Sequence, residues 1–231
     1  LVGGAPDQRR RFMDWMTFHV EHGYLDAWRR FRRALKQRNA ALKAGSGSLE
    51  SWDREFVELA LALDRIRENL VGRAIPVLED CAADLLELPV SFEYQRGWSD
   101  GRDLAEVLRE NRGRDQQTGT TNYGPHRGDL KLRMDERLAK RLVSRGQQKL
   151  LACAMVLGSV GVVGPALPQP PLLMLDDPAA ELDRSALERL MAAVQASGGQ
   201  VIATALTPEA VPVPAAHSLF HVEQGVLSAA G

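Results

Sequence analysis

The sequence predicts an α/β fold in which a mostly parallel sheet with helices is joined to a helical hairpin arm. Helical periodicity dominates the first part of the 231-residue chain and extends to residue 86. After Pro89 the pattern becomes mixed, with alternating segments, short helices and continuous apolar runs. One apolar run, residues 172–175, leads directly into Asp176 and Asp177. Such a run is typical of a strand that is buried on both faces of a parallel sheet.

The arm is predicted to consist of helices joined by short turns. An acidic N-cap, Asp7, opens the first helix, and a basic amphipathic helix covers residues 24–42. A Gly/Ser turn at 45–48 leads into one long helix over 49–86, which Pro76 could kink or break. Two long helices joined in this way form an antiparallel hairpin.

We expect two domains, the arm at residues 1–88 and a second unit at 89–231. In the second unit we predict strands at 90–98, 130–134, 172–175 and 200–205, helices at 103–110, 142–156 and 183–195, loops at 111–121 and 158–171, and a hairpin at 218–228 that turns at Gln224-Gly225. The strand–helix–strand order near the acids implies a right-handed βαβ unit.

The charges are unevenly distributed, although the net charge is only −1. Residues 1–43 carry ten Lys or Arg against four acids, whereas residues 49–110 carry fifteen acids against seven Arg. The basic helix is therefore the candidate for a sequence-independent contact with the phosphates of DNA. Its four candidate residues are Arg29, Arg30, Arg32 and Arg33. The alternative is a solvated helix whose arginines pair with acids of the next helix, such as Glu55 and Glu58.

The sequence predicts a cytoplasmic protein. Cys81 and Cys153 have no metal-ligand spacing, which suits a reducing compartment. No signal peptide is evident, and no apolar run reaches about 18 residues, so neither export nor membrane insertion is expected. The first residue is Leu1 rather than Met, which fits a processed or truncated chain.

The acid pair after residues 172–175 lies where open α/β sheets bind their ligands, at the carboxyl end of a strand. This is the pattern of a Walker B strand, in which the first acid, Asp176, holds Mg²⁺ and the second, Asp177, handles the attacking water. The alternative is a buried strand followed by a carboxylate that only caps a helix.

A second group of residues, Ser144 to Lys149 (SRGQQK), opens an apolar helix. Ser144 is a plausible N-cap, and Gly146 would allow a backbone to approach a ligand closely. A helix N-terminus with these residues can bind an anion. The alternative is an ordinary capped helix with an exposed basic end.

Five segments taken in order resemble the RecF family, bacterial recombination mediators related to SMC heads. They are RRFMDW (10–15), RALKQRN (33–39), GPHRGDL (124–130), SRGQQK (144–149) and LLMLDDPAAELD (172–183). The resemblance implies that residues 89–231 are the C-terminal lobe of an ABC-ATPase-like head. In GPHRGDL, Arg127 and Asp129 could form a supporting ion pair, or His126 and Arg127 could face nucleotide or DNA.

The resemblance also implies roles for individual residues. Asp176 would hold Mg²⁺, and Asp177 would stand where most ABC proteins carry a Glu as general base. The shorter Asp implies slow hydrolysis. Thr204 stands near the position of a switch His in other heads. The residues expected to contact ATP bound to the opposite subunit, or to lie at the dimer seam, are Ser144, Arg145, Gly146, Gln147 and Asp183.

For the complete protein, the resemblance implies a slow, Mg²⁺-dependent ATPase that forms an ATP-dependent homodimer on DNA and has RecO and RecR as partners. No Gly in this sequence is followed by Lys, so the G-x-x-x-x-G-K-[ST] phosphate loop would have to lie upstream. Whether this chain alone is an enzyme is therefore left open. The alternative is a non-catalytic helical-arm module for binding DNA or protein, with a degenerate half-head.

Overall fold

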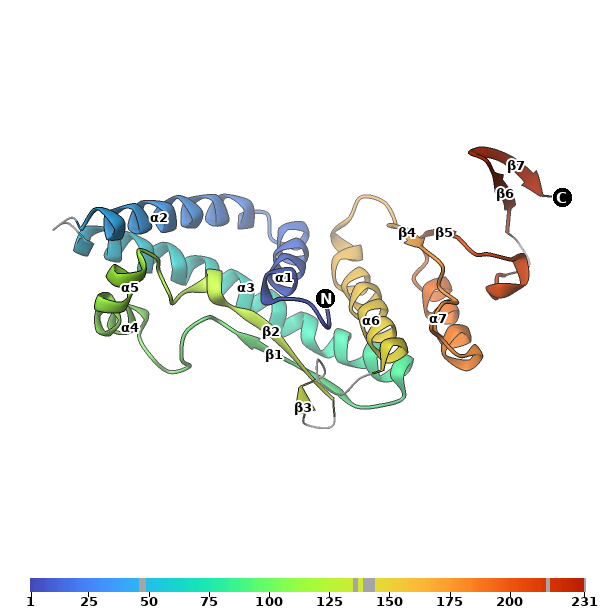
Figure 1. Cartoon of the computed structure of the whole chain (residues 1–231), viewed down its shortest axis with the longest axis horizontal. Helices are drawn as coiled ribbons and strands as arrows, with labels where there is room; N and C mark the ends of the chain where they lie inside the picture. The colour runs from blue at the N-terminus through green and yellow to red at the C-terminus, as the bar shows by residue number, and fades with distance from the viewer. Residues whose placement is uncertain (46–48, 135–136, 139–143, 215–216, 231) are drawn as a thin grey trace.

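The computed structural model describes residues 1–45, 49–134, 137–138, 144–214 and 217–230. The molecule is elongated, with the hairpin of α2 and α3 at one end and the small hairpin β6–β7 at the other (Figure 1). The helices are α1 (Pro6–Val20), α2 (Tyr24–Ala44), α3 (Leu49–Leu86), α4 (Leu104–Glu110), α5 (Arg112–Thr118), α6 (Arg145–Val163) and α7 (Arg184–Ala196). The strands are β1 (Val90–Gln95), β2 (Asp129–Met134), β3 (Arg137–Leu138), β4 (Leu172–Leu175), β5 (Gln200–Ala203), β6 (Leu219–Glu223) and β7 (Val226–Ala230).

The predicted helical hairpin is confirmed, and α3 has the predicted bounds. It runs through Pro76 as one helix of 38 residues, so Pro76 does not break it. The N-cap of α1 is Ala5 rather than Asp7, because Pro6 takes the first helical position, for which its fixed φ is suited. Gly45 ends α2 in the left-handed conformation. The rest of the predicted Gly/Ser turn, residues 46–48, lies outside the described residues.

A buried ionic network joins the arm to α5. Arg38 is fully buried and donates to Asp115 (2.8 Å) and to Asp53 (2.7 Å). Asp115 lies in α5, within the segment that the sequence analysis assigned to a polar loop. That assignment was wrong because α5 has no apolar periodicity. Its place is set instead by these contacts, and by Asp115 accepting from Asn122.

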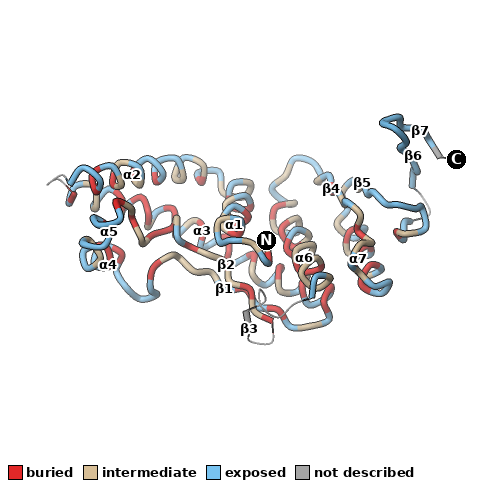
Figure 2. Tube along the Cα trace, viewed as in Figure 1, coloured by how far each residue is buried: buried red, intermediate tan, exposed pale blue. Residues whose placement is uncertain are grey.

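The largest core lies where α1, the second half of α3, β1, β2, α6 and α7 meet, as the buried segments in Figure 2 show. Its fully buried members include Met16 on α1, Leu78 on α3, Leu130 on β2, Leu151 on α6 and Leu190 on α7. The long helix α3 therefore belongs both to the arm and to this core. The boundary at residue 88 stays a prediction.

The described strands form three small sheets. β1–β2–β3 is antiparallel and pairs Val90 with Met134, and β6–β7 is an antiparallel hairpin. Its turn is at Gln224-Gly225, as predicted, and both residues have positive φ, as in a type I′ hairpin turn. β4 and β5 are parallel, as predicted, with Met174 opposite Ile202.

The predicted burial of β4 on both faces is wrong. Leu173 is buried in the main core, whereas Leu172 and Met174 on the opposite face are 51% and 76% exposed. On β5, Ile202 is likewise exposed, contrary to the prediction of an internal strand. Within the described residues, helices cover only one face of this parallel pair.

Helix α6 extends further than predicted, to Val163, and its predicted start at residue 142 lies outside the described residues. Together with the turn that follows it (residues 145–166), it is long and apolar enough to cross a membrane by length and composition, with a mean hydropathy of 1.7. Its buried residues, however, pack in the main core against α3 and α7.

The GPHRGDL segment is an anchor for α1. Asp129 accepts two hydrogen bonds of 2.8 Å from Arg9, and Arg10 donates to the carbonyl of Gly128 (2.8 Å). The predicted pair between Arg127 and Asp129 is therefore wrong, because Asp129 is taken by Arg9 and Arg127 is exposed. Of the two alternatives, the supporting role holds for Asp129.

The ring of His126 packs against the rings of Phe31 and Phe56, and its Nε2 lies 2.8 Å from the carbonyl oxygen of Thr121. Because that partner is an acceptor, Nε2 carries the proton of the neutral ring. Burial lowers the pKa of His126 from 6.5 to about 4. The ring thus packs against the helices of the arm.

This shift predicts that the protein loses stability in mild acid. Between pH 6.5 and about 4 the unfolded chain binds a proton at His126 that the folded chain excludes. The free energy of unfolding should therefore fall as the pH decreases through this window, by up to about 3 kcal/mol. Urea denaturation at a series of pH values measures it. In His126→Gln, which does not titrate, this part of the pH dependence should disappear; an unchanged pH dependence would contradict the assignment.

Candidate nucleotide-binding edge

Asp176 and Asp177 lie directly after β4, at the carboxyl end of the parallel pair, as predicted. Thr204, directly after β5, lies beside them. Its hydroxyl donates to Oδ1 of Asp176 (2.8 Å) and accepts from the backbone N–H of Asp177 (3.0 Å). The backbone N–H of Thr204 donates to the carbonyl of Leu175 (2.9 Å). The two strand ends therefore fix the orientation of Asp176 while leaving it exposed.

Asp177 has a left-handed backbone, with φ of 41°. This conformation is unfavourable for residues other than Gly, and Asp tolerates it better than most. Its carbonyl accepts from Nζ of Lys149 (2.7 Å), which also donates to the carbonyl of Ala180 (2.8 Å). The lysine of the SRGQQK segment therefore binds the backbone of the loop that follows the acids.

Ser144 is the N-cap of α6, as predicted, and forms a capping box with Gln147. Its Oγ accepts from the Gln147 N–H (3.2 Å), and its own N–H donates to Oε1 of Gln147 (3.0 Å). The Ser144 side chain is exposed, and its hydroxyl proton is not used by the cap. The side-chain oxygen of Gln147, Oε1, is used by the capping box. An ordinary cap and an anion site are both compatible with this geometry.

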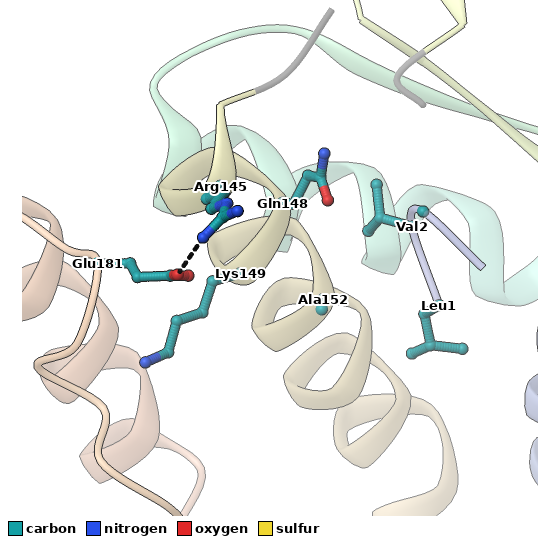
Figure 3. Close-up of a pocket in the computed structure, with 8 residues that line it drawn as sticks. Leu1, Val2, Arg145, Gln148, Lys149, Ala152 and Glu181 are labelled. Carbon is teal, nitrogen blue, oxygen red and sulfur yellow. Dashed lines mark ion pairs between the residues drawn. The ribbon is translucent and has the colours of Figure 1, made fainter. Parts of the chain in front are cut away.

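The start of α6 packs against the loop between Asp177 and Asp183. Gly146 allows this approach, because a Cβ at that position would lie 2.6 Å from the carbonyl oxygen of Glu181. Arg145 pairs with the Glu181 carboxylate at 3.8 Å (Figure 3). Beside this contact is an open cavity of about 450 Å³. The side chains of Arg145, Gln148, Lys149 and Glu181 lie around it.

Asp183, predicted at a dimer seam, is the N-cap of α7 in the structure. Its Oδ1 accepts from the backbone N–H of Ala186 (2.8 Å), and the residue is exposed. A capping carboxylate keeps a second oxygen for other partners, so the capping of α7 is compatible with a position of Asp183 at a dimer seam, which stays a prediction.

The residues present suit a magnesium ion by their donor chemistry. Mg²⁺ prefers oxygen ligands, and it is usually held by one or two carboxylates together with waters and substrate phosphates. Asp176 and Asp177 offer such carboxylates, and Thr204 uses only Oδ1 of Asp176. In the described part of the chain, no group of three or more His, Cys, Asp or Glu side chains could hold a metal ion alone. The remaining ligands of such an ion would be waters or substrate phosphates.

The four arginines of α2 form a separate surface, which we call the α2 arginine face (Arg29, Arg30, Arg32 and Arg33). All four side chains are exposed. The guanidinium of Arg32 lies 4.7 Å from the ring centroid of Trp28. Among the described residues, the arginines of this face form no ion pair with a carboxylate, Glu55 and Glu58 included. The alternative in which those acids neutralise the face is therefore not what the structure contains.

The structure thus brings together Asp176, Asp177 and Thr204 at the strand ends, and joins Arg145 and Gly146 to the same loop. The sequence analysis included Lys149 in the group that could bind an anion, but it did not predict the bonds of Lys149 to the loop. Nor did it foresee the pair of Arg145 with Glu181 or the contact between Thr204 and Asp176. A signal was present for Lys149, since it lies four residues after Arg145 and hence on the same helix face.

These features define the C-terminal lobe of an ABC-ATPase-like head. They are a parallel strand that ends in two acids, the loop after it, and a helix with a serine N-cap that packs on that loop. Solved structures bear out this fold: RecF structures described as the recombination mediator protein with ATP and with an ATP analogue, in the RecFOR pathway, match all of this chain with TM-scores of 0.82 and 0.81. They share 19% and 20% of its residues, and the match covers 64% and 65% of their chains.

Sequence comparison finds similar proteins. A DNA replication and repair protein RecF of Pseudomonas aeruginosa is 37% identical over 240 residues, and one of Pseudomonas putida is 40% identical over 238. A third, from Thioalkalivibrio sulfidiphilus, is 38% identical over 232 residues. These matches cover 97–99% of this chain and 64% of each relative. The chain is similar to these RecF proteins along nearly its whole length and spans 64% of theirs. No family model matches it.

Proposed function

We propose that this chain is part of a RecF-type ATP-dependent DNA-binding protein that acts in DNA replication and recombinational repair. Support comes from relatives that carry the name DNA replication and repair protein RecF, and from solved RecF structures described with ATP. The observation that carries the proposal is the acid pair oriented at the end of β4, next to the loop on which α6 begins.

In the proposed mechanism, two heads enclose ATP between them. Asp176 would hold Mg²⁺, whose charge would stabilise the phosphates during hydrolysis. Asp177 would orient the attacking water and accept its proton. Because its side chain is one methylene shorter than that of Glu, it would place the water less well, and hydrolysis would be slow. Thr204 would keep Asp176 oriented through its 2.8 Å hydrogen bond.

The start of α6 would serve the nucleotide of the opposite head. Ser144, with its free hydroxyl proton, and the positive end of the helix dipole favour a phosphate. Arg145 would add a cation once it leaves Glu181, and their separation of 3.8 Å is that of a weak, exposed pair. Gln147 and Gly146 would shape the turn, and Asp183 would lie at the seam between the heads.

DNA would bind to the resulting dimer through its phosphates, with the α2 arginine face as the contact on this chain. The protein would then assist recombinase loading at gaps, in the cytoplasm, together with RecO and RecR. ATP would favour the dimer because it binds that state more tightly than the monomer.

A second candidate is a non-catalytic helical arm that binds DNA or another protein. It is favoured by the exposed, unpaired arginines of α2 and by the lack of a G-x-x-x-x-G-K-[ST] motif in this sequence. This second candidate assigns no role to the hydrogen-bonded arrangement of Asp176, Asp177 and Thr204.

The state of association of a full-length RecF-type protein that contains this chain distinguishes the two. With a slowly hydrolysed ATP analogue and Mg²⁺, it should sediment as a dimer, and Ser144→Arg should keep it monomeric because the larger cation blocks the seam. Ser91→Arg, an exposed serine on β1, is the matched control and should dimerise normally. A nucleotide-independent monomer, or dimerisation unaffected by Ser144→Arg, would favour the non-catalytic module.

A further inference from the structure

We propose that Lys149 and Thr204 are positioning residues that hold the backbone of Asp177 from both sides and thereby couple the acid pair to the start of α6. This inference rests on the function proposed above and deepens it. It concerns regulation of the same site, because α6 would contact one nucleotide while Asp177 serves the other.

We call Thr204 and Lys149, together with their bonds to the backbone of Asp177, the clamp. Its first member is Thr204. Its hydroxyl is used twice, as a donor to Asp176 (2.8 Å) and as an acceptor from the Asp177 N–H (3.0 Å). A hydroxyl can play both roles at once, whereas a methyl group of the same size can play neither. One side chain on β5 therefore orients the carboxylate of the first acid and the backbone of the second.

The second member is Lys149. Its ammonium group donates to the carbonyls of Asp177 (2.7 Å) and Ala180 (2.8 Å), the two ends of the turn that follows the acids. The Ala180 N–H also bonds to the carbonyl of Asp177 at 3.2 Å, so the turn is closed. The left-handed φ of Asp177, 41°, is held by partners on both its N–H and its carbonyl. Such a backbone persists only where its surroundings fix it.

The clamp also transmits movement, because α6 and the loop are joined at three points. Besides the Lys149 bonds, Gly146 lies against the carbonyl of Glu181, and Arg145 pairs with the Glu181 carboxylate. A shift of the first turn of α6 would therefore displace the Asp177 backbone. Engagement of Ser144 by a nucleotide on the partner head would in this way reach the acid that activates water.

Amide hydrogen exchange in the full-length RecF-type protein tests the clamp without relying on catalysis. Thr204→Val should raise the exchange rate of the Asp177 amide about tenfold, as expected for the loss of one hydrogen bond, and Thr204→Ser should restore it. Thr207→Val is the matched control, since this exposed threonine makes no capping bond. Equal exchange in Thr204→Val and the wild type would overturn the role of Thr204.

Coupling and catalysis form the second arm. In the wild type, dimerisation with the ATP analogue should slow exchange at Asp177, and in Lys149→Met it should not. Both Lys149→Met and Thr204→Val should lower kcat about tenfold or more with little change in KM for ATP. Arg184→Met, which removes an exposed cation on α7, is the control. If the wild type hydrolyses no ATP, the proposed function fails, and the exchange rates of the Asp177 amide still test whether the clamp exists. If the wild type is active and both variants have its kcat, the clamp is wrong.

Discussion

Asp177→Asn in the full-length RecF-type protein should give dimers that bind ATP and Mg²⁺ but hardly hydrolyse the nucleotide. Asn is nearly isosteric with Asp, and the backbone contacts of residue 177 with Thr204 and Lys149 do not involve its carboxylate. The variant therefore keeps the fold of the loop and loses only the group that accepts a proton. Loss of a general base lowers the rate by about 10²–10⁴-fold. Phosphate release and sedimentation with ATP measure the two effects.

Asp177→Glu is the informative companion variant. It keeps the carboxylate and adds the methylene present in most ABC proteins, so it should hydrolyse ATP at least as fast as the wild type. The proposed role of Asp177 is wrong if Asp177→Asn stays monomeric in the presence of ATP, or if its hydrolysis rate equals that of the wild type.

Reversal of the α2 arginine face should weaken DNA binding by about 10³-fold or more at low salt. Each arginine that contacts a phosphate releases a counterion, so changing all four to Glu (Arg29, Arg30, Arg32 and Arg33) should reduce the slope of log K against log salt by up to about 3–4. Fluorescence anisotropy with a labelled duplex at several salt concentrations measures both quantities. The fold should be retained, because all four side chains are exposed.

A matched pair of double variants controls for net charge. Arg29→Glu with Arg33→Glu alters the proposed face, and Arg54→Glu with Arg65→Glu reverses two exposed arginines on α3. The first pair should lower both affinity and salt slope, whereas the second should have a much smaller effect. A salt slope that is unchanged in the quadruple variant would place the DNA contact elsewhere.

The elements that the sequence predicted well are those with strong local signals. The bounds of α3 follow from its sustained apolar periodicity, and the β6–β7 turn from Gln224-Gly225. The capping role of Ser144 was predictable because a capping box is encoded within four residues. The parallel pairing of β4 with β5 followed from the order of the elements.

The features that were missed depend on partners far away in the chain. Helix α5 has no apolar stripe of its own and is fixed by Arg38, which lies 77 residues from Asp115. Asp129 is 120 residues from Arg9, so its nearer neighbour Arg127 was assigned instead. The bonds from Lys149 span about 30 residues and end on backbone carbonyls, which have no signature in the sequence. The exposure of Met174 depends on what covers β4, which an apolar run does not specify.

The central claim is that Asp177 and Ser144 serve different nucleotides, each completed by a second copy of the protein. Mixing two inactive full-length variants, Asp177→Asn and Ser144→Arg, tests this directly. If the claim holds, the mixture should regain ATPase activity that neither variant has alone, because a dimer with one copy of each variant keeps one site in which both Asp177 and Ser144 are intact. A mixture as inactive as its separate components would contradict the claim.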